Sequence, residues 1–214
     1  MGIISPVGLD VPTAWVSLVD GRSGIGRITR FDASGDQWRV KIAGEAWGFD
    51  PANYMNSKDA RRVDRTTQLA LAAADEAVKQ ACLTTLADRD DIGVMVGCGS
   101  GGIETYADAY RTLLEKGPTR MNPFLIPAEV VDSSGVAIGI RYGFHGPNFA
   151  VTSACATLPS GPGMRIFSFA PNAAFTKSRS FAASLTVRYG VTVWYPSGIA
   201  LTISASFQIP PASS

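Results

Sequence analysis

The spacing of apolar residues predicts helices and strands that alternate along the chain. The strongest helical pattern runs over residues 64 to 81. Helical spacing also covers residues 103 to 116 and residues 130 to 142. Short, continuous apolar runs predict buried strands at residues 92 to 96 and 149 to 151. This alternation is typical of an α/β fold.

Capping and turn residues mark the ends of these elements and several shorter ones. Asp64 is placed to cap the strongest helix, and Asp10 to cap a helix that stops at Gly21. Residues 38 to 45 alternate as in an edge strand or a hairpin arm, and residues 2 to 8 form a strand stub that leaves through a Pro/Gly turn. Loops are expected at residues 23 to 34 and 124 to 127.

Residues 146 to 157 place a cysteine in a tight turn behind an apolar strand. Gly146-Pro147-Asn148 is typical of a turn. The residues around Cys155 are all small, so the backbone can bend sharply there. Such a bend can present a nucleophilic thiol beside free backbone N–H groups that bind an oxyanion. A small cysteine buried in a strand fits the same residues. The local residues leave both interpretations open.

The composition indicates a globular protein without the strong net charge that general binding to nucleic acid or membranes requires. Of the 214 residues, 46% are hydrophobic and 17% are charged, and the formal net charge is +1. The three cysteines, at positions 82, 98 and 155, have neither metal-binding spacing nor an even disulfide framework. We therefore expect a cytoplasmic protein that binds no metal.

The last part of the chain has a different composition. No aspartate or glutamate follows Asp132, and the few charged residues after residue 158 are all Lys or Arg, among Ser, Ala, Phe and Pro. An ordinary globular segment mixes both signs of charge. Residues 188 to 194 and 199 to 207 are apolar and β-prone but carry no recognisable site.

A glycine-rich loop, Gly97-Cys98-Gly99-Ser100-Gly101-Gly102, lies between a predicted strand and a predicted helix. It matches the pattern G-x-G-x-x-G of dinucleotide-binding proteins. That fingerprint also needs a second strand ending in an acidic residue about 20 residues further on. Residues 117 to 123 are loop-like instead. A tight turn that packs strand against helix is the favoured interpretation, and a nucleotide-dependent oxidoreductase is an alternative.

Several motifs together resemble the β-ketoacyl-acyl-carrier-protein synthases, the elongating condensing enzymes of the thiolase fold. The resemblance covers residues 1 to 157, and the cysteine turn is its most specific part. Besides the glycine loop, the motifs include Ile4-Ser5-Pro6-Val7-Gly8, Ala60-Arg61-Arg62-Val63-Asp64-Arg65, Pro123-Phe124-Leu125-Ile126-Pro127 and Thr152-Ser153-Ala154-Cys155-Ala156-Thr157.

The resemblance implies the N-terminal half of a layered α/β/α thiolase-like fold and a role in fatty-acid or polyketide chain elongation. It implies that Cys155 accepts an acyl group before a Claisen condensation with malonyl-carrier protein, without a cofactor. Lys58, Arg61 and Arg62 fall where the family docks the acidic acyl carrier protein. Ser100 falls where a larger apolar residue often gates the acyl pocket. Intact members of the family are homodimers.

Two features depart from the family. Gly161-Pro162-Gly163 disfavours the long helix that the family has behind its cysteine. His145 is the only histidine, and it matches neither of the two downstream catalytic histidines. We interpret His145 as a loop residue, and a dyad with Cys155 is a second possibility.

We therefore divide the chain into two parts. Residues 1 to 157 are expected to be a synthase N-terminal domain with a truncated first strand. Residues 158 to 214 are expected to be an unrelated tail, disordered or non-native, that arises from a frameshift or a gene-model break. We expect no condensation activity from such a chain, and a non-catalytic subunit that binds acyl carrier protein is the alternative function.

Overall fold

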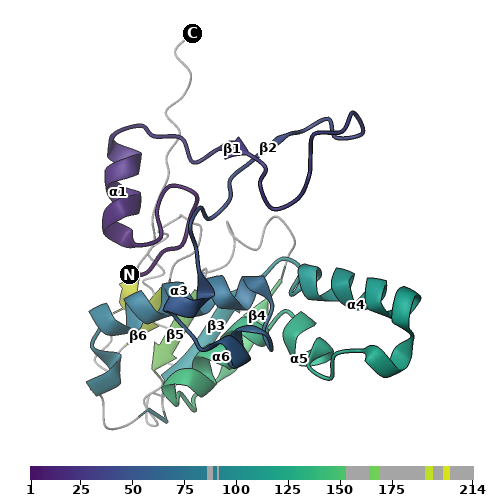
Figure 1. The fold of residues 1–214 in the computed structure, drawn as a ribbon. Coiled ribbons are helices and arrows are strands. Elements are labelled where there is room, and N and C mark those ends of the chain that lie inside the picture. Colours follow the sequence, from purple (N-terminus) through teal and green to yellow (C-terminus); the bar gives the residue numbers. More distant parts are fainter. Residues whose placement is uncertain (86–88, 91, 153–163, 169–190, 195–199, 203–214) are drawn as a thin grey trace.

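The computed structural model describes residues 1–85, 89–90, 92–152, 164–168, 191–194 and 200–202 (Figure 1). Helices α3 (Arg65–Gln80) and α6 (Ser133–Tyr142) pack against each other and cover one face of a five-stranded sheet. Helices α4 (Ile103–Lys116) and α5 (Leu125–Glu129) lie side by side beyond one end of that sheet. This helix-on-sheet arrangement agrees with the expected α/β class.

The strands of the five-stranded sheet are β3 (Ile92–Gly97), β4 (Asn148–Val151), β5 (Met164–Ser168), β6 (Val191–Trp194) and β7 (Ala200–Thr202). The N-terminal segment contributes a helix and a small second sheet, and single-turn helices join the larger elements. The other elements are α1 (Val11–Val19), β1 (Gly26–Arg27), β2 (Ile42–Ala43), η1 (Pro51–Asn53), α2 (Ser57–Ala60), η2 (Leu83–Thr85) and η3 (Pro118–Arg120).

The strand order in the sheet is β4-β3-β5-β6-β7, which leaves β4 at an edge. Strands β3 and β4 are parallel, with Val94 opposite Asn148 and Gly97 opposite Val151. Strand β5 pairs antiparallel with the other side of β3. The parallel register brings the carboxyl ends of β3 and β4 together.

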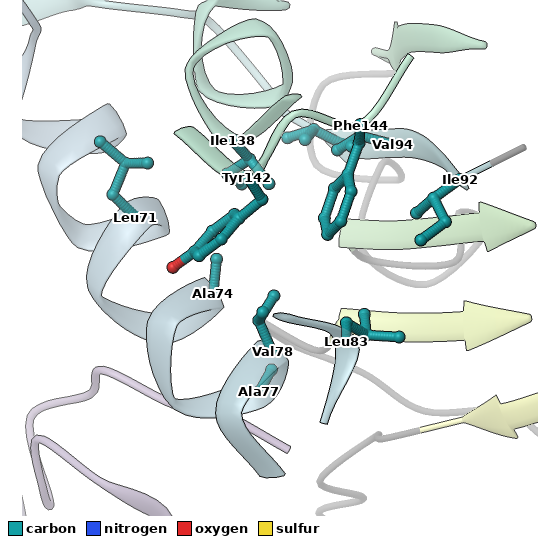
Figure 2. Packing of buried hydrophobic residues seen from close by; sticks show 11 residues of the cluster. Leu71, Ala74, Ala77, Val78, Leu83, Ile92, Val94, Ile138, Tyr142 and Phe144 are labelled. Atoms are coloured by element: carbon teal, nitrogen blue, oxygen red, sulfur yellow. The ribbon is translucent and has the colours of Figure 1, made fainter. Parts of the chain in front are cut away.

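The main core lies between α3, α6 and β3 (Figure 2). Helix α3 presents small residues such as Ala74 and Ala77, which are fully buried and let the neighbouring elements approach closely. Ile138 of α6 and Val94 of β3 fill the space opposite them, and both are at most 1% exposed. Burial of these apolar side chains is the main favourable term for the fold.

A polar contact also ties α3 to α6. Asp75 accepts hydrogen bonds from the Tyr142 hydroxyl at 2.9 Å and from Lys79 Nζ at 2.5 Å. Burial alone would raise the pKa of Asp75, but these hydrogen bonds and the positive charges of Lys79 and Arg141 together outweigh it and hold the pKa below its usual value. The pKa of Tyr142 is raised by burial and by the Asp75 carboxylate. The ionised carboxylate is therefore the form that this contact stabilises.

The long elements agree with their sequence patterns. Helix α3 begins after Asp64, whose side chain accepts from the Thr66 N–H, and α1 begins after Asp10, which accepts from the Thr13 N–H. Helix α4 and strands β3 and β4 lie where the apolar spacing predicted them. Helix α6 ends, as expected, at a left-handed Gly143, but it begins three residues later than predicted.

Two loop predictions were wrong. Residues 125 to 129 form the short helix α5, since a proline in the first helical turn occupies a position that needs no N–H donor. Gly26 and Arg27, expected in a loop, pair as β1 with β2, which lies inside the alternating stretch from residue 38 to 45.

In the stub over residues 2 to 8, the backbone turn between Ser5 and Gly8 is present.

Strands β6 and β7 fall within the two stretches that the sequence marked as β-prone. The boundary at residue 157 and the origin of the tail stay predictions.

Candidate functional site

The ends of β3 and β4 place the glycine loop beside the segment that leads to Cys155. The Cys98 N–H donates to the Val151 carbonyl at 3.1 Å, and the Thr152 hydroxyl donates to the Gly99 carbonyl at 3.3 Å. These contacts continue the parallel pairing one step past both strands. Cys155 itself, and any helix behind it, lie outside the described residues.

Close packing accounts for the last two glycines of the loop. Gly101 has a φ of +67°, and a Cβ there would lie 2.1 Å from the Glu129 carbonyl oxygen. A Cβ on Gly102 would lie 2.3 Å from the Ala128 carbonyl oxygen. The Gly102 N–H donates to the Glu129 carbonyl at 2.8 Å. The loop is therefore held directly on the end of α5.

A carboxylate occupies the N-terminus of α4, where a dinucleotide-binding loop would hold phosphate. Asp64 Oδ2 accepts from the Thr105 N–H at 2.9 Å and from the Thr105 hydroxyl at 2.7 Å. Asp64 is only 3% exposed. This arrangement favours the packing interpretation of Gly97–Gly102 over the oxidoreductase alternative, because a bound pyrophosphate would face a buried negative charge.

Sequence reasoning found Asp64 as the cap of α3 but missed its contact with α4. Gly102, the residue at the start of α4, has no side chain to cap it. A predicted helix that starts at a glycine has no side chain of its own to bind its first N–H groups. This was the available signal that a residue elsewhere in the chain caps α4.

The other two candidates of the site are exposed. Ser100 lies in the glycine loop, two residues before Gly102, with its side chain accessible. The ring of His145 lies on the surface, with Nδ1 2.7 Å from Asp90 Oδ1. This contact agrees with a loop role for His145. The dyad with Cys155 is not tested, because Cys155 is outside the described residues.

Lys58, Arg61 and Arg62 form a basic patch over α2 and the turn that precedes α3. Lys58 and Arg61 are exposed. Arg62 is half-exposed, 4.0 Å from the Asp59 carboxylate, and its guanidinium carbon lies 4.7 Å from the centre of the Phe124 ring. The structure thus brings the basic patch to the start of α5, which sequence spacing did not reveal.

Arg65, the fourth cation of this segment, has a different environment. Its guanidinium carbon lies 4.4 Å from the centre of the Phe49 ring. Burial, and then the charge of Arg30, lower the pKa of Arg65. Arg65 also lines a cavity of about 420 Å³ between the β1–β2 region and α3, which contains none of the predicted site residues.

Within the described parts of the chain, no three His, Cys, Asp or Glu side chains are grouped closely enough to hold a metal ion. None of the helices that the structure describes is long and apolar enough to cross a bilayer.

In comparison with protein families, residues 1–158 match the N-terminal domain of β-ketoacyl synthases. The chain is 44% identical over 160 residues to the 3-oxoacyl-[acyl-carrier-protein] synthase 2 of Staphylococcus aureus. It is 39% identical over 157 residues to the protein of the same name from a Synechocystis species. These alignments cover 73% of this chain but only 39% and 37% of the two relatives.

Solved structures with a similar fold include ketosynthases. The ishigamide ketosynthase/chain length factor gives a TM-score of 0.59 at 28% identity and covers 71% of this chain and 38% of that one. A type II polyketide ketosynthase, solved in complex with its acyl-carrier protein, gives a TM-score of 0.53 at 20% identity, over 75% of this chain and 41% of that one.

Proposed function

This chain belongs to the β-ketoacyl synthase family, and on that premise we propose that it accepts an acyl group on Cys155 in fatty-acid or polyketide chain elongation. The family match extends through residue 158 and so includes the cysteine turn. The observation that carries the proposal is the parallel β3–β4 pair, which sets the glycine loop beside the strand that leads to Cys155.

In the proposed step, the Cys155 thiolate attacks the carbonyl carbon of an acyl thioester on acyl carrier protein. A new sulfur–carbon bond forms, the bond to the carrier thiol breaks, and the carrier thiolate leaves and takes up a proton. Backbone N–H groups at the cysteine turn are proposed to stabilise the intermediate oxyanion. Ser100 is proposed to line the acyl pocket, at the position where a larger apolar residue often gates that pocket in the family.

We propose that the basic patch docks the carrier protein. Two of its three cations are exposed, and the third lies across Phe124 with its charge still accessible. Opposite charge attracts an acidic partner and speeds association, more strongly at low ionic strength. The relatives' name, 3-oxoacyl-[acyl-carrier-protein] synthase 2, includes acyl-carrier protein and supports this choice of partner.

Condensation requires decarboxylation of malonyl-carrier protein and attack of its carbanion on the acyl-Cys155 thioester. The sequence has one histidine, and it contacts Asp90 rather than belonging to the cysteine turn. We therefore propose that this chain on its own carries out acyl transfer without condensation. A homodimer formed through β4 is part of the proposal, because β4 is an edge strand among the described residues.

The test is transfer of a radiolabelled acyl group from acyl-carrier protein to the purified chain. We expect label on the wild-type chain and on Cys82→Ala, whose cysteine is exposed and distant in sequence, and none on Cys155→Ala. Label that persists on Cys155→Ala would contradict the proposed nucleophile. Binding of the carrier without transfer would instead favour a non-catalytic carrier-binding subunit, and the basic patch is the observation that supports that second candidate.

A further inference from the structure

We infer that Asp64 is a positioning residue that couples the basic patch to the glycine loop carrying Ser100. The inference rests on the proposed function, since it takes the patch as the carrier-protein surface and the loop as part of the acyl pocket. It adds a physical connection between the two, so that carrier docking changes the pocket.

A single carboxylate joins the two regions. Asp64 lies two residues after Arg62 of the basic patch. Its Oδ1 accepts a hydrogen bond from the Thr66 N–H, at 2.8 Å, at the start of α3. Its Oδ2 accepts from the backbone and the hydroxyl of Thr105 at the start of α4, directly behind the glycine loop. Helix α4 has no capping side chain at its own first residue. Asp64 therefore supplies the cap for two helices that start 38 residues apart in the sequence.

The fit around this carboxylate is tight. Asp64 is 3% exposed, and a Cβ on Gly102 would lie 3.0 Å from the Asp64 Cβ. Asp64 therefore has no solvent-filled space to move into, and a displacement of it must move the loop or the start of α4. Hydrogen bonds to a buried charged group are among the stronger ones in proteins, so the two helix starts move together.

A second contact runs in parallel with the first. Arg62 of the basic patch lies over the Phe124 ring at the start of α5. The other end of α5 accepts the Gly102 N–H through the Glu129 carbonyl at 2.8 Å. A carrier protein that draws Arg62 toward its acidic surface therefore pulls on both α5 and Asp64, and both contacts end at the glycine loop.

Two substitutions weaken the α4 contact and leave the α3 cap in place. Asp64→Asn keeps one oxygen for the Thr66 N–H, because asparagine is as good a cap as aspartate, but it turns an NH₂ group toward the Thr105 N–H. Thr105→Val removes only the hydroxyl donor and keeps the shape. Thr66→Val is the matched control, since the exposed side chain of Thr66 is not the group that Asp64 holds.

The experiment is backbone hydrogen exchange measured by mass spectrometry on the full chain, with and without holo-acyl carrier protein. Without carrier, we expect segment 98–106 to exchange about tenfold faster in Asp64→Asn and Thr105→Val than in wild type, from loss of a charge-assisted hydrogen bond. Segment 66–80 should be unchanged in both variants and in Thr66→Val. With carrier, wild type should gain protection in segments 56–68 and 98–106, and Asp64→Asn in segment 56–68 only.

The outcomes separate the inference from the function it rests on. Protection of segment 56–68 with an unchanged segment 98–106 in wild type overturns the coupling and leaves docking intact. Equal protection of segment 98–106 in wild type and Asp64→Asn overturns the role of Asp64. Absence of protection at segment 56–68 in every chain overturns the proposed docking surface, and the coupling with it.

Discussion

Replacement of Ile138 by alanine tests whether α6 is packed as described. Ile138 lies at the centre of the core cluster, is 0% exposed, and faces α3 and β3 (Figure 2). The change deletes three carbon atoms, and at about 0.8 kcal/mol per buried methylene the lost transfer free energy is roughly 2.4 kcal/mol. The cavity left behind adds to this, so we expect a loss of about 3 to 4 kcal/mol in the free energy of unfolding.

Ile140 provides a matched control on the same helix. It is 78% exposed, so the same substitution removes little buried surface, and alanine favours the helix slightly. We expect the unfolding free energy of Ile140→Ala to lie within about 0.5 kcal/mol of wild type. Urea unfolding followed by far-ultraviolet circular dichroism, at one fixed protein concentration, gives both values by linear extrapolation. A loss below about 1 kcal/mol at Ile138, or equal losses at both positions, would refute this account of the core.

Three further predictions follow from contacts described above. The pKa of Asp75 is lower in the folded than in the unfolded chain, so the ionised carboxylate stabilises the fold above about pH 4, and this stabilisation is lost as pH falls through the folded pKa. The urea midpoint should therefore fall more steeply between pH 7 and pH 3 for wild type than for Asp75→Asn. An equally steep fall in both proteins would contradict the contact. Arg61→Glu should weaken binding of acyl carrier protein about tenfold at low salt and less at high salt, measured by fluorescence anisotropy, whereas Arg22→Glu, outside the basic patch, should not. The purified chain should elute on size exclusion as an associated species, because β4 is an edge strand among those that the structure describes and Phe149 on it is 42% exposed. A compact stable monomer would argue against this.

Sequence reasoning predicted the elements whose pattern is local. The spacing of Leu69, Ala73 and Ala77 follows the helix period, so α3 could be placed from the sequence to within a residue of each end. Continuous apolar runs gave β3 and β4 for the same reason. Helix α5 was missed because its five residues give too short a window for helical periodicity to show.

The contacts that shape the site were not available from the pattern. Asp64 meets Thr105 across 41 residues of sequence, and Arg62 meets Phe124 across 62 residues. Side-chain spacing along one helix carries no information on which other helix start lies opposite a given carboxylate. The motif G-x-G-x-x-G shows the same limit, because only the packing of Gly101 and Gly102 on α5 tells a structural turn from a phosphate-binding loop.

The parallel pairing of β3 with β4 has a consequence for how the chain reaches this structure. The register joins residues separated by on the order of fifty positions, and α4, α5 and α6 all lie between them. Such non-local pairing forms slowly, because the loop must close before any strand contact stabilises it. During synthesis β3 leaves the ribosome well before its partner, and its apolar edge stays open in the meantime. We expect the helices between the two strands to form first and the strand pair to be the late, rate-limiting event of folding.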